Sequence, residues 1–493
     1  MGMLLTFENV NAQIDENAIG YYNEALRFSR TVPGGTARIQ AIGGTQIALG
    51  GDVSNIYSNP AGLGFFNRSQ VSFTPSLKLY SNDAEYFGLN TRDNGGRFGF
   101  DNLGIVFSSP RSNANSSWRG GSFGISYTKT NNFNDQFTYE GRNPNSSIID
   151  QFIENANGIL INDLDGLTGL AYDIFLINPA IDDVGNPIDG AYDSFIFGLP
   201  VQREIVTTEG SQSQWSISYG GNVADRFYFG IGLGITSVNY EQTKSYSESN
   251  FDAPDPGIND FTIRERLNID GSGINATVGF IFRPNDHIRV GASLVTPTYY
   301  QFDEESDVII NASYDNFFYE PENITLGEET VQSDIFISTY DLTTPLRLNG
   351  GVAFFFGKNG FISADVEYID YGNSSLGSND FSTTADNRTI ESLYTSVVNF
   401  RVGGEYRHDV FRFRAGFGYH DDPYTTEDID LSRTELSLGA GVRFKKFYAD
   451  LGVVTNLSEE RSYSPYTFFD GTGPVANIAT NNTNAILTVG FNF

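Results

Sequence analysis

The sequence of 493 residues contains no cysteine and few basic residues. Without cysteine there is no disulfide framework and no thiolate chemistry. No apolar run approaches the roughly 18 residues that a membrane helix needs, which excludes helical membrane spans. The 30 Lys and Arg face 60 Asp and Glu, a formal net charge of −30. Because phosphate binding requires clustered cations, the charge balance argues against a nucleic-acid partner.

Motifs for catalysis are also missing. The three histidines, His287, His408 and His420, have no obvious serine partner, so a catalytic triad is not indicated. No glycine-rich phosphate loop follows a strand into a helix. Acidic segments such as "EDID" (427–430) would suit Ca²⁺, but EF-hand spacing is missing and a solvated acidic face is the preferred interpretation. We therefore expect no enzyme, no cofactor and no metal site.

Aromatic residues and glycine are abundant, and they alternate. In "DRFYFGIGLGIT" (225–236), large apolar residues occupy every second position and three glycines lie between them. Strict alternation over this length predicts a strand. A soluble sandwich would also alternate, but a uniformly large apolar face opposite glycines favours a lipid-facing exterior and a crowded lumen. The mean hydropathy of −0.26 does not contradict this. In a membrane barrel, apolar lipid-facing residues alternate with polar lumen-facing residues, so the mean hydropathy resembles that of a soluble protein.

Fourteen such runs follow one another along the chain. They lie near 69–81, 101–110, 119–138, 212–222, 225–246, 262–283, 286–311, 333–356, 360–373, 392–408, 411–421, 431–445, 447–462 and 478–493. Connections after even-numbered runs are mostly short, whereas those after odd-numbered runs are long and acidic, as in barrels with periplasmic turns and outer loops. The predicted fold is an all-β, fourteen-stranded antiparallel transmembrane barrel in a Gram-negative outer membrane, in contact with membrane lipid and lipopolysaccharide.

The two chain ends carry signals of their own. Residues 1–13, "MGMLLTFENVNAQ", have a short apolar patch without a basic residue, and we interpret them as the remnant of a signal peptide. We assign 14–67 to an N-terminal globular segment and 68–493 to the barrel itself, with a long extracellular loop at 139–211. The terminal strand ends in Phe493 and resembles the signal that the barrel assembly machinery recognises, which makes this machinery a partner during biogenesis.

Residues 36–64 read locally as turns and short helices rather than as a strand. Asp52 is placed to cap a helix over "VSNIY", and Pro60 suits the first position of a helical turn with Asn59 extended before it. An ordinary N-terminal cap is one interpretation of this segment.

The other interpretation rests on a resemblance. "ARIQAIGGTQIALGGDVSNIYSNPAGL" is similar to the hatch segment of the FadL-like long-chain fatty acid transporters of Gram-negative outer membranes, and "TTPLRLNGGVAFFF" (343–356) resembles a strand of that family. The resemblance implies that 14–67 is a hatch that plugs the barrel, and that a hydrophobic ligand leaves sideways through a kinked third strand. The hatch and gating residues that we predict are Asp52, Asn59, Pro60, Ala61 and Gly62.

The third run begins "WRGGSFGISY" (118–127), and its glycines weaken a regular ladder. We predict a lateral opening at Gly120, Gly121 and Gly124. An opening at membrane depth must line a cavity or be covered by protein, so we expect the turn at 59–61 to face this strand from the lumen.

Charged residues gather on the inward face of the late runs. We predict a lumen charge network formed by Arg401, Glu405, Arg407, Arg412, Arg414 and Arg443. It is either a structural network that holds the hatch or a cationic patch for a ligand carboxylate.

In the loop at 139–211, Ile149, Phe152 and Ile153 recur at helical spacing behind Ser146 or Ser147. This is either a loop helix packed on its neighbours or an apolar outer surface on which hydrophobic ligands land.

The leading functional hypothesis is a channel for passive uptake of hydrophobic small molecules such as long-chain fatty acids. The alternative is a FadL-like barrel that serves as a structural subunit of a larger outer-membrane secretion or assembly complex, with outer-membrane proteins as partners. A water-filled porin is disfavoured by the hatch.

Overall fold

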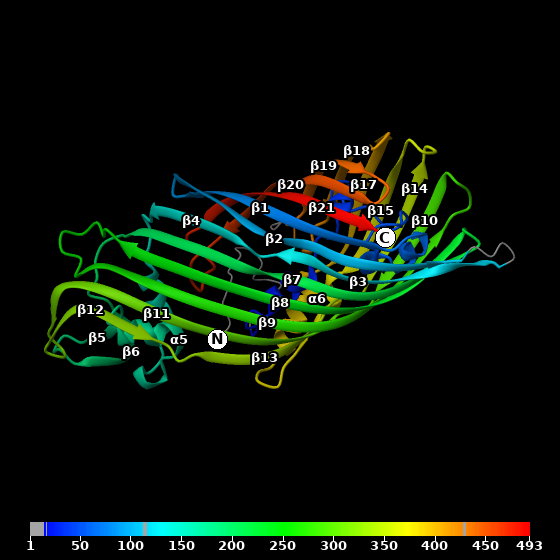
Figure 1. The fold of residues 1–493 in the computed structure, drawn as a ribbon. Coiled ribbons are helices and arrows are strands. Elements are labelled where there is room, and N and C mark those ends of the chain that lie inside the picture. Colours follow the sequence, from blue (N-terminus) through cyan, green and yellow to red (C-terminus); the bar gives the residue numbers. More distant parts are fainter. Residues whose placement is uncertain (1–13, 16, 112–115, 427–429) are drawn as a thin grey trace.

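The computed structural model describes residues 14–15, 17–111, 116–426 and 430–493. The signal-peptide prediction for 1–13 and most of the acidic "EDID" segment lie outside these residues. The chain forms a closed antiparallel barrel of fourteen strands, in which the first strand pairs with the last from Gln70↔Asn492 to Glu85↔Asn477 (Figure 1). The predicted fold is therefore confirmed.

Ten crossings of the barrel are single strands, and four are broken into two pieces. The single strands are β1 (Gln70–Tyr86), β2 (Leu89–Pro110), β7 (Val201–Val223), β8 (Phe227–Ser249), β9 (Ile258–Phe282), β17 (Ser396–His408), β18 (Phe411–His420), β19 (Arg433–Arg443), β20 (Phe447–Tyr463) and β21 (Ala476–Asn492). The broken ones are β3 (Trp118–Asn132) with β4 (Asp135–Arg142), β10 (Ile288–Val295) with β11 (Tyr299–Tyr319), β13 (Phe336–Thr343) with β14 (Arg347–Phe355), and β15 (Gly360–Asp370) with β16 (Ser375–Gly377).

The second and fourth crossings are longer than the sequence predicted. β2 begins at Leu89, and β1 and β2 form one hairpin around a turn at Phe87 and Gly88, both of which have positive φ. The first outer connection is therefore short, unlike the other outer connections. The fourth crossing begins at Val201, so the long loop spans 143–200 between β4 and β7.

The outer connections carry the remaining elements. They are α4 (Ile148–Ala156), η2 (Ile161–Asp163), α5 (Gly166–Asp173), the two-stranded sheet of β5 (Asn178–Ile181) and β6 (Pro187–Asp193), β12 (Ile324–Gln332), η3 (Tyr371–Asn373) and α6 (Thr384–Leu393). β5, β6, β12 and α5 lie at the outer end of the barrel, α6 lies nearer its middle, and short turns close the other end (Figure 1). No helix among the described residues is long and apolar enough to cross a membrane.

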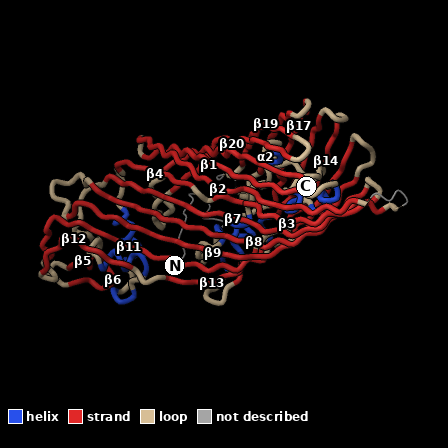
Figure 2. Tube along the Cα trace, in the orientation of Figure 1, coloured by secondary structure: helices blue, strands red, loops and turns tan. Residues whose placement is uncertain are grey.

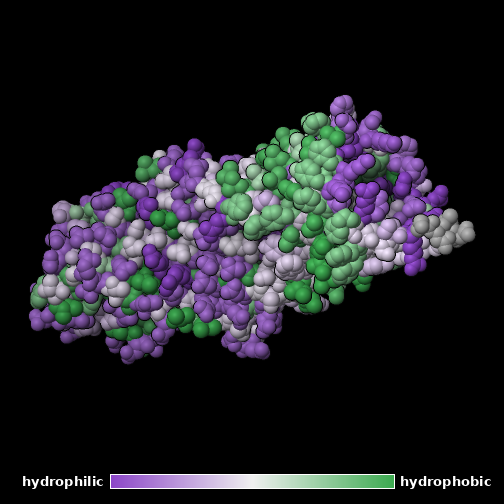
Figure 3. All heavy atoms as spheres, viewed as in Figure 1, coloured by the Kyte–Doolittle hydropathy of each residue, from purple (hydrophilic) through white to green (hydrophobic). Residues whose placement is uncertain are grey.

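On the face seen in Figure 3, an apolar belt lies near the end with the short turns, and exposed large apolar side chains occur on all fourteen crossings. On β8, the outward side chains from Phe227 to Ile235 are apolar and exposed, whereas the next outward residues, Ser237 and Asn239, are polar. The eight steps of about 3.4 Å from Phe227 to Ile235 give about 27 Å of strand, which suits the hydrocarbon layer of an outer membrane. The barrel thus has the form of an outer-membrane protein whose strands project beyond the bilayer on the outer side.

Residues 14–67 lie inside the ring of strands (Figure 2). They form α1 (Tyr22–Ser29), α2 (Ala37–Gln40), α3 (Asn55–Ser58) and η1 (Pro60–Phe65), joined by turns. Pro60 opens η1 and the extended Asn59 precedes it, as predicted. Asp52 accepts a hydrogen bond from the backbone N–H of Ser54, the residue before α3, so it closes the turn that leads into the helix.

Candidate functional site

Inward glycines of the strands make room for this N-terminal segment. A Cβ added at Gly230 would lie 2.2 Å from the carbonyl carbon of Pro60, and one at Gly291 would lie 2.1 Å from the Ile47 carbonyl oxygen. On β17, a Cβ at Gly403 would lie 2.0 Å from the Ile42 carbonyl oxygen. The glycines that alternate with apolar residues in the sequence therefore let backbone of the segment touch backbone of the wall.

The Asn59–Pro60 turn lies against β7, β8, β9 and β10. The Asn59 side-chain amide donates to the Ile47 carbonyl at 2.7 Å and to the Ala292 carbonyl of β10 at 3.3 Å. Ala61 and Gly62 are buried in the same turn, and the Gly62 N–H donates to the Asn59 carbonyl. The Asn59 amide thus bonds to β10 and not to the third strand, whereas η1, which begins at Pro60, contacts β3 as well.

A buried ion-pair network links the segment to the late strands. Arg414 donates to Glu405 at 2.8 Å and to Asp450 at 2.7 Å. Arg38 of α2 lies 3.4 Å from the same Glu405 carboxylate and 3.3 Å from Asp52. The network thus joins barrel and segment through α2.

The other arginines predicted for this network bind different carboxylates, and one of them lies outside the network. Arg407 donates to Glu405, Arg401 pairs with Glu367 at 2.6 Å, and Arg443 lies 3.7 Å from Asp450. Arg412 lies apart from them, because its guanidinium donates to backbone carbonyls at the β17–β18 turn. With its carboxylates paired to arginines of this chain, the network matches the structural interpretation better than a free cationic patch.

The wall is closed at the glycines of the third strand. β2 and β3 pair without interruption from Pro110↔Gly120 to Asn102↔Thr128, and Gly121 and Gly124 also pair with β7. A Cβ at Gly124 would lie 2.7 Å from Ile56, so this glycine accommodates the N-terminal segment. The predicted opening at Gly120, Gly121 and Gly124 is therefore not present.

The third strand bends higher up, between β3 and β4. Above Asn102↔Thr128, the edge of β2 from Leu89 to Asp101 pairs only with β1 among the described residues. β4 lies behind the β1–β2 hairpin, where the inward Lys78 donates to the Asn132 and Asn134 carbonyls. The strand is thus kinked at 131–134, and its kink leaves one edge of β2 unpaired.

Residues 30–34 of the N-terminal segment cover this kink from inside. The Val32 N–H donates to the Thr130 carbonyl at 2.8 Å, and the Asn131 side chain donates to the Arg30 carbonyl at 3.2 Å. Lys129 fills the gap beside β2, with its ammonium 4.0 Å from the Asp101 carboxylate. Backbone freed by the kink is therefore paired by the segment, although not by Asn59.

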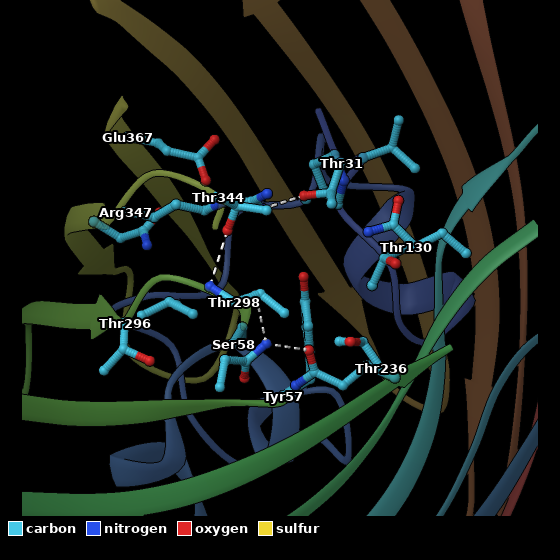
Figure 4. A pocket seen from close by; sticks show the side chains of 18 of the residues that line it. Thr31, Tyr57, Ser58, Thr130, Thr236, Thr296, Thr298, Thr344, Arg347 and Glu367 are labelled. Carbon is cyan, nitrogen blue, oxygen red and sulfur yellow. Dashed lines mark hydrogen bonds between the residues drawn. The ribbon is translucent and has the colours of Figure 1, made fainter. Parts of the chain in front are cut away.

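Two cavities lie along the lumen. The inner one, about 70 Å³, is lined by hydroxyl and amide side chains and by Arg347, Glu367 and Arg401 (Figure 4). Gln46 Oε1 and Asn275 Oδ1 line it without a protein partner among the described residues. The outer one, about 630 Å³, lies between α1, α4 and the outer parts of β8, β9 and β11.

Helix α1 and an aromatic layer separate the two cavities. Tyr21 and Glu24 line the outer cavity, whereas Phe28, at the other end of the helix, lines the inner one. Phe28 stacks on Phe302 at 4.8 Å between ring centroids, and Phe302 stacks on Tyr340 at 5.1 Å. A molecule that moves from one cavity to the other must displace this layer.

Glu24 is buried at the inner face of the outer cavity. It accepts a hydrogen bond from the Tyr340 hydroxyl, and Arg27 lies 4.0 Å away. Burial, reinforced by the nearby Glu304 carboxylate, raises the pKa of Glu24 to about 8. A substantial fraction of Glu24 is therefore neutral at pH 7.

The outer-loop helix packs inward. Ser147 caps α4 in a capping box with Asp150, so the predicted helix and its cap are present. Ile149 and Phe152 are 3% and 1% exposed, and Ile153 packs partly buried beside them. These side chains do not form an external landing surface, because α4 turns its apolar face onto α5, β9 and β11.

Solved structures share this fold. The toluene transporter TodX of Pseudomonas putida aligns over 94% of this chain and 99% of its own, with 14% identity and a TM-score of 0.53. A FadL homologue of Pseudomonas aeruginosa aligns over 94% and 100%, with 14% identity and a TM-score of 0.56. The toluene transporter TbuX of Ralstonia pickettii aligns over 94% and 99%, with 16% identity and a TM-score of 0.52.

No protein-family model matches the sequence, and no curated protein matches it significantly. At these identities the structural likeness shows the fold. The chain therefore folds as the same kind of barrel as TodX, TbuX and the FadL homologue.

Three features of the site were not predicted from the sequence. The resemblance implied a kinked third strand, but the position of the kink at 131–134, the covering segment at 30–34 and the outer cavity depend on which segments meet in space. The run "TNNFND" (130–135), with three asparagines in six residues, is a turn signal inside a predicted strand and could have located the kink.

Proposed function

We propose that this protein is an outer-membrane channel for the passive uptake of hydrophobic small molecules, in which residues 14–67 act as a plug. The observation that carries the proposal is the kink of the third strand. It leaves an unpaired edge of β2 beside Phe98 and Phe100, whose side chains are 67% and 48% exposed at the outer margin of the apolar belt. A plugged lumen does not serve polar solutes, whereas a lateral gap at this depth opens toward lipid.

The route has three steps. A hydrophobic molecule enters the outer cavity, passes α1 and the aromatic layer around Phe28 as the plug rearranges, and leaves between β2 and β3. The ion pair between Lys129 and Asp101 lies in this gap, and it must separate before a molecule can pass. No step needs an energy source, because transfer from water into lipid is itself favourable.

Filling the gap tests the route. Gly99 of β2 faces Lys129, and a Cβ there would lie 2.7 Å from its Nζ, the flexible end of a side chain that can move aside. In cells of a Gram-negative host that lacks channels of this kind, Gly99→Phe should slow uptake of radiolabelled toluene or a long-chain fatty acid about tenfold relative to the wild type.

Gly377→Phe is the matched control, because nothing lies within 4 Å of a Cβ added there. It should leave uptake unchanged. Equal uptake by the wild type and Gly99→Phe would overturn the lateral route, but the proposal that the protein is a channel would stand. A wild type that takes up neither probe would favour the alternative, a structural subunit of an outer-membrane complex.

A further inference from the structure

Acidic side chains dominate the outer cavity. Seven carboxylates and two cations line it: Glu24, Asp165, Glu204, Glu265, Glu304, Asp307 and Asp334 against Lys244 and Arg266. Arg266 is engaged by Asp307 in two hydrogen bonds of 3.0 and 2.7 Å. Lys244 lies 6.0 Å from the ring of Tyr463, whose hydroxyl donates to Glu204, so its charge lies near that carboxylate.

Apart from Glu204, which lies near Lys244, four carboxylates that line the cavity have no cation within 4.0 Å among the described residues: Asp165, Glu265, Glu304 and Asp334. Glu304 is the most buried of the four, at 6% exposed. Its Oε1 accepts a hydrogen bond from the Tyr21 hydroxyl at 3.0 Å, while its Oε2 is buried without a hydrogen-bond partner in the described chain. A buried carboxylate oxygen at the edge of a cavity is an acceptor for a donor that the described residues do not supply.

The walls around these carboxylates are aromatic and apolar. Tyr246 and Tyr466 line the cavity at right angles, 6.4 Å between centroids, and Phe152 of α4 lies beside them. Leu267 and Val308 continue the apolar wall from β9 and β11. Aromatic faces attract ammonium groups as well as hydrocarbon, so the same wall suits both ends of an amphiphilic amine.

We propose that the outer cavity selects hydrophobic molecules that carry a positively charged amine, and that Glu304 is the residue that receives the ammonium group. This inference rests on the proposed uptake function and specifies its ligand class. The hydrocarbon part lies against the apolar wall, and the ammonium donates to Glu304 Oε2. A ligand carboxylate would meet uncompensated negative charge in the same place, which disfavours free fatty acids as cargo.

Three probes of equal shape and different head group test the assignment: 3-phenylpropylamine, 3-phenylpropan-1-ol and 3-phenylpropanoate. Their binding to the purified full-length protein in detergent is measured by saturation-transfer NMR and calorimetry at pH 7. The amine should bind at least tenfold more tightly than the propanoate, with the alcohol between them. Glu304→Gln should weaken amine binding about tenfold and change alcohol binding less than twofold.

Glu305→Gln is the matched control, because Glu305 neighbours Glu304 on β11, is exposed and does not line the cavity. It removes the same charge from a protein of net charge −30, so a general electrostatic attraction would respond equally to both substitutions. Glu265→Gln provides a second cavity variant and should also weaken the amine selectively.

The outcomes separate this inference from the uptake function. Selective loss of amine binding in Glu304→Gln and Glu265→Gln, with Glu305→Gln unchanged, supports it. Propanoate binding as tight as amine binding, or equal effects of Glu304→Gln and Glu305→Gln, overturns it, while uptake of the neutral alcohol by cells would still support the channel. If none of the three probes binds and the alcohol is not taken up, both proposals fail.

Discussion

Gly230 of β8 lies directly against Pro60 of the N-terminal segment, so that a Cβ at Gly230 would come within 2.2 Å of the Pro60 carbonyl carbon. This contact explains why glycine alternates with large apolar residues in "FGIGLG" (229–234). One face of the strand meets lipid, and the other must approach backbone. The wall and the segment that fills it are thus matched residue by residue.

Gly230→Val should loosen the segment, because the added methyl groups have no space and overpacking costs about 1–3 kcal/mol. Trypsin should then cut at Arg27, Arg30 or Arg38, all of which are shielded in the wild type. Gly350→Val is the control, since a Cβ at Gly350 meets only Val366 at 3.6 Å. Equal resistance of Gly230→Val and the wild type to trypsin would contradict the contact.

Arg414→Met should destabilise the protein by about 3–5 kcal/mol, because Glu405 and Asp450 would lose a shared buried partner. Arg412→Met should change stability by no more than about 0.5 kcal/mol, since Arg412 donates only to turn carbonyls. Urea unfolding followed by the fluorescence of Trp118 and Trp215 measures both. A similar loss in the two variants would mean that the network does not hold the barrel to the segment.

The stability of the protein should fall as the pH rises from about 4.5 to about 8, because folding raises the pKa of Glu24 from its usual 4.5 to about 8. The folded state keeps this proton over that interval and the unfolded state does not, so stability is greatest below it. Glu24→Gln cannot ionise, and its melting temperature should change less between pH 5 and pH 9 than that of the wild type. An equal change in both would exclude Glu24 as the cause.

Tags inserted next to Val184, in the outer loop between β5 and β6, should be accessible on intact cells. Tags inserted at Lys358, in the β14–β15 turn, should be accessible only after the outer membrane is permeabilised. This prediction rests on the location of the long loops and the short turns at opposite ends of the barrel (Figure 1). Labelling of Lys358 tags on intact cells would reverse the orientation.

The sequence predicted those parts of the molecule that depend on local pattern. Alternation located all fourteen crossings, and Asn59 and Pro60 formed the predicted turn because their backbone preferences are local. Contacts between segments distant in the sequence could not be predicted from local pattern. Gly124 looked like a weak point of the third strand, yet it accommodates Ile56. For Ile149 the sequence left open whether the loop helix packs on its neighbours or forms an outer surface, and the structure places Ile149 in a buried cluster.

The position of the lateral gap shows the same limit. Pairing between β2 and β3 ends at Asn102↔Thr128 because residues 30–34 supply the next hydrogen bonds from inside the barrel. The residue pattern of β3 itself does not indicate that residues 30–34 pack against it. The charge network could be predicted more readily from the sequence. Alternation along the strands places Glu405 and Arg414 on the inward face, and the two residues pair across adjacent strands.

The central claim is that hydrophobic molecules pass the N-terminal segment inside the lumen, and a reversible tether tests it most directly. A Cβ at Gly452 of β20 would lie 3.7 Å from the Cβ of Ala37, a spacing that suits a disulfide, and the chain has no other cysteine. Uptake of radiolabelled toluene is measured in cells that carry the Ala37→Cys, Gly452→Cys double variant, before and after reduction, with each single variant as control. The account predicts slow uptake with the disulfide formed and recovery to the single-variant rate on reduction. Equal uptake in the oxidised and reduced states would contradict passage that depends on movement of this segment.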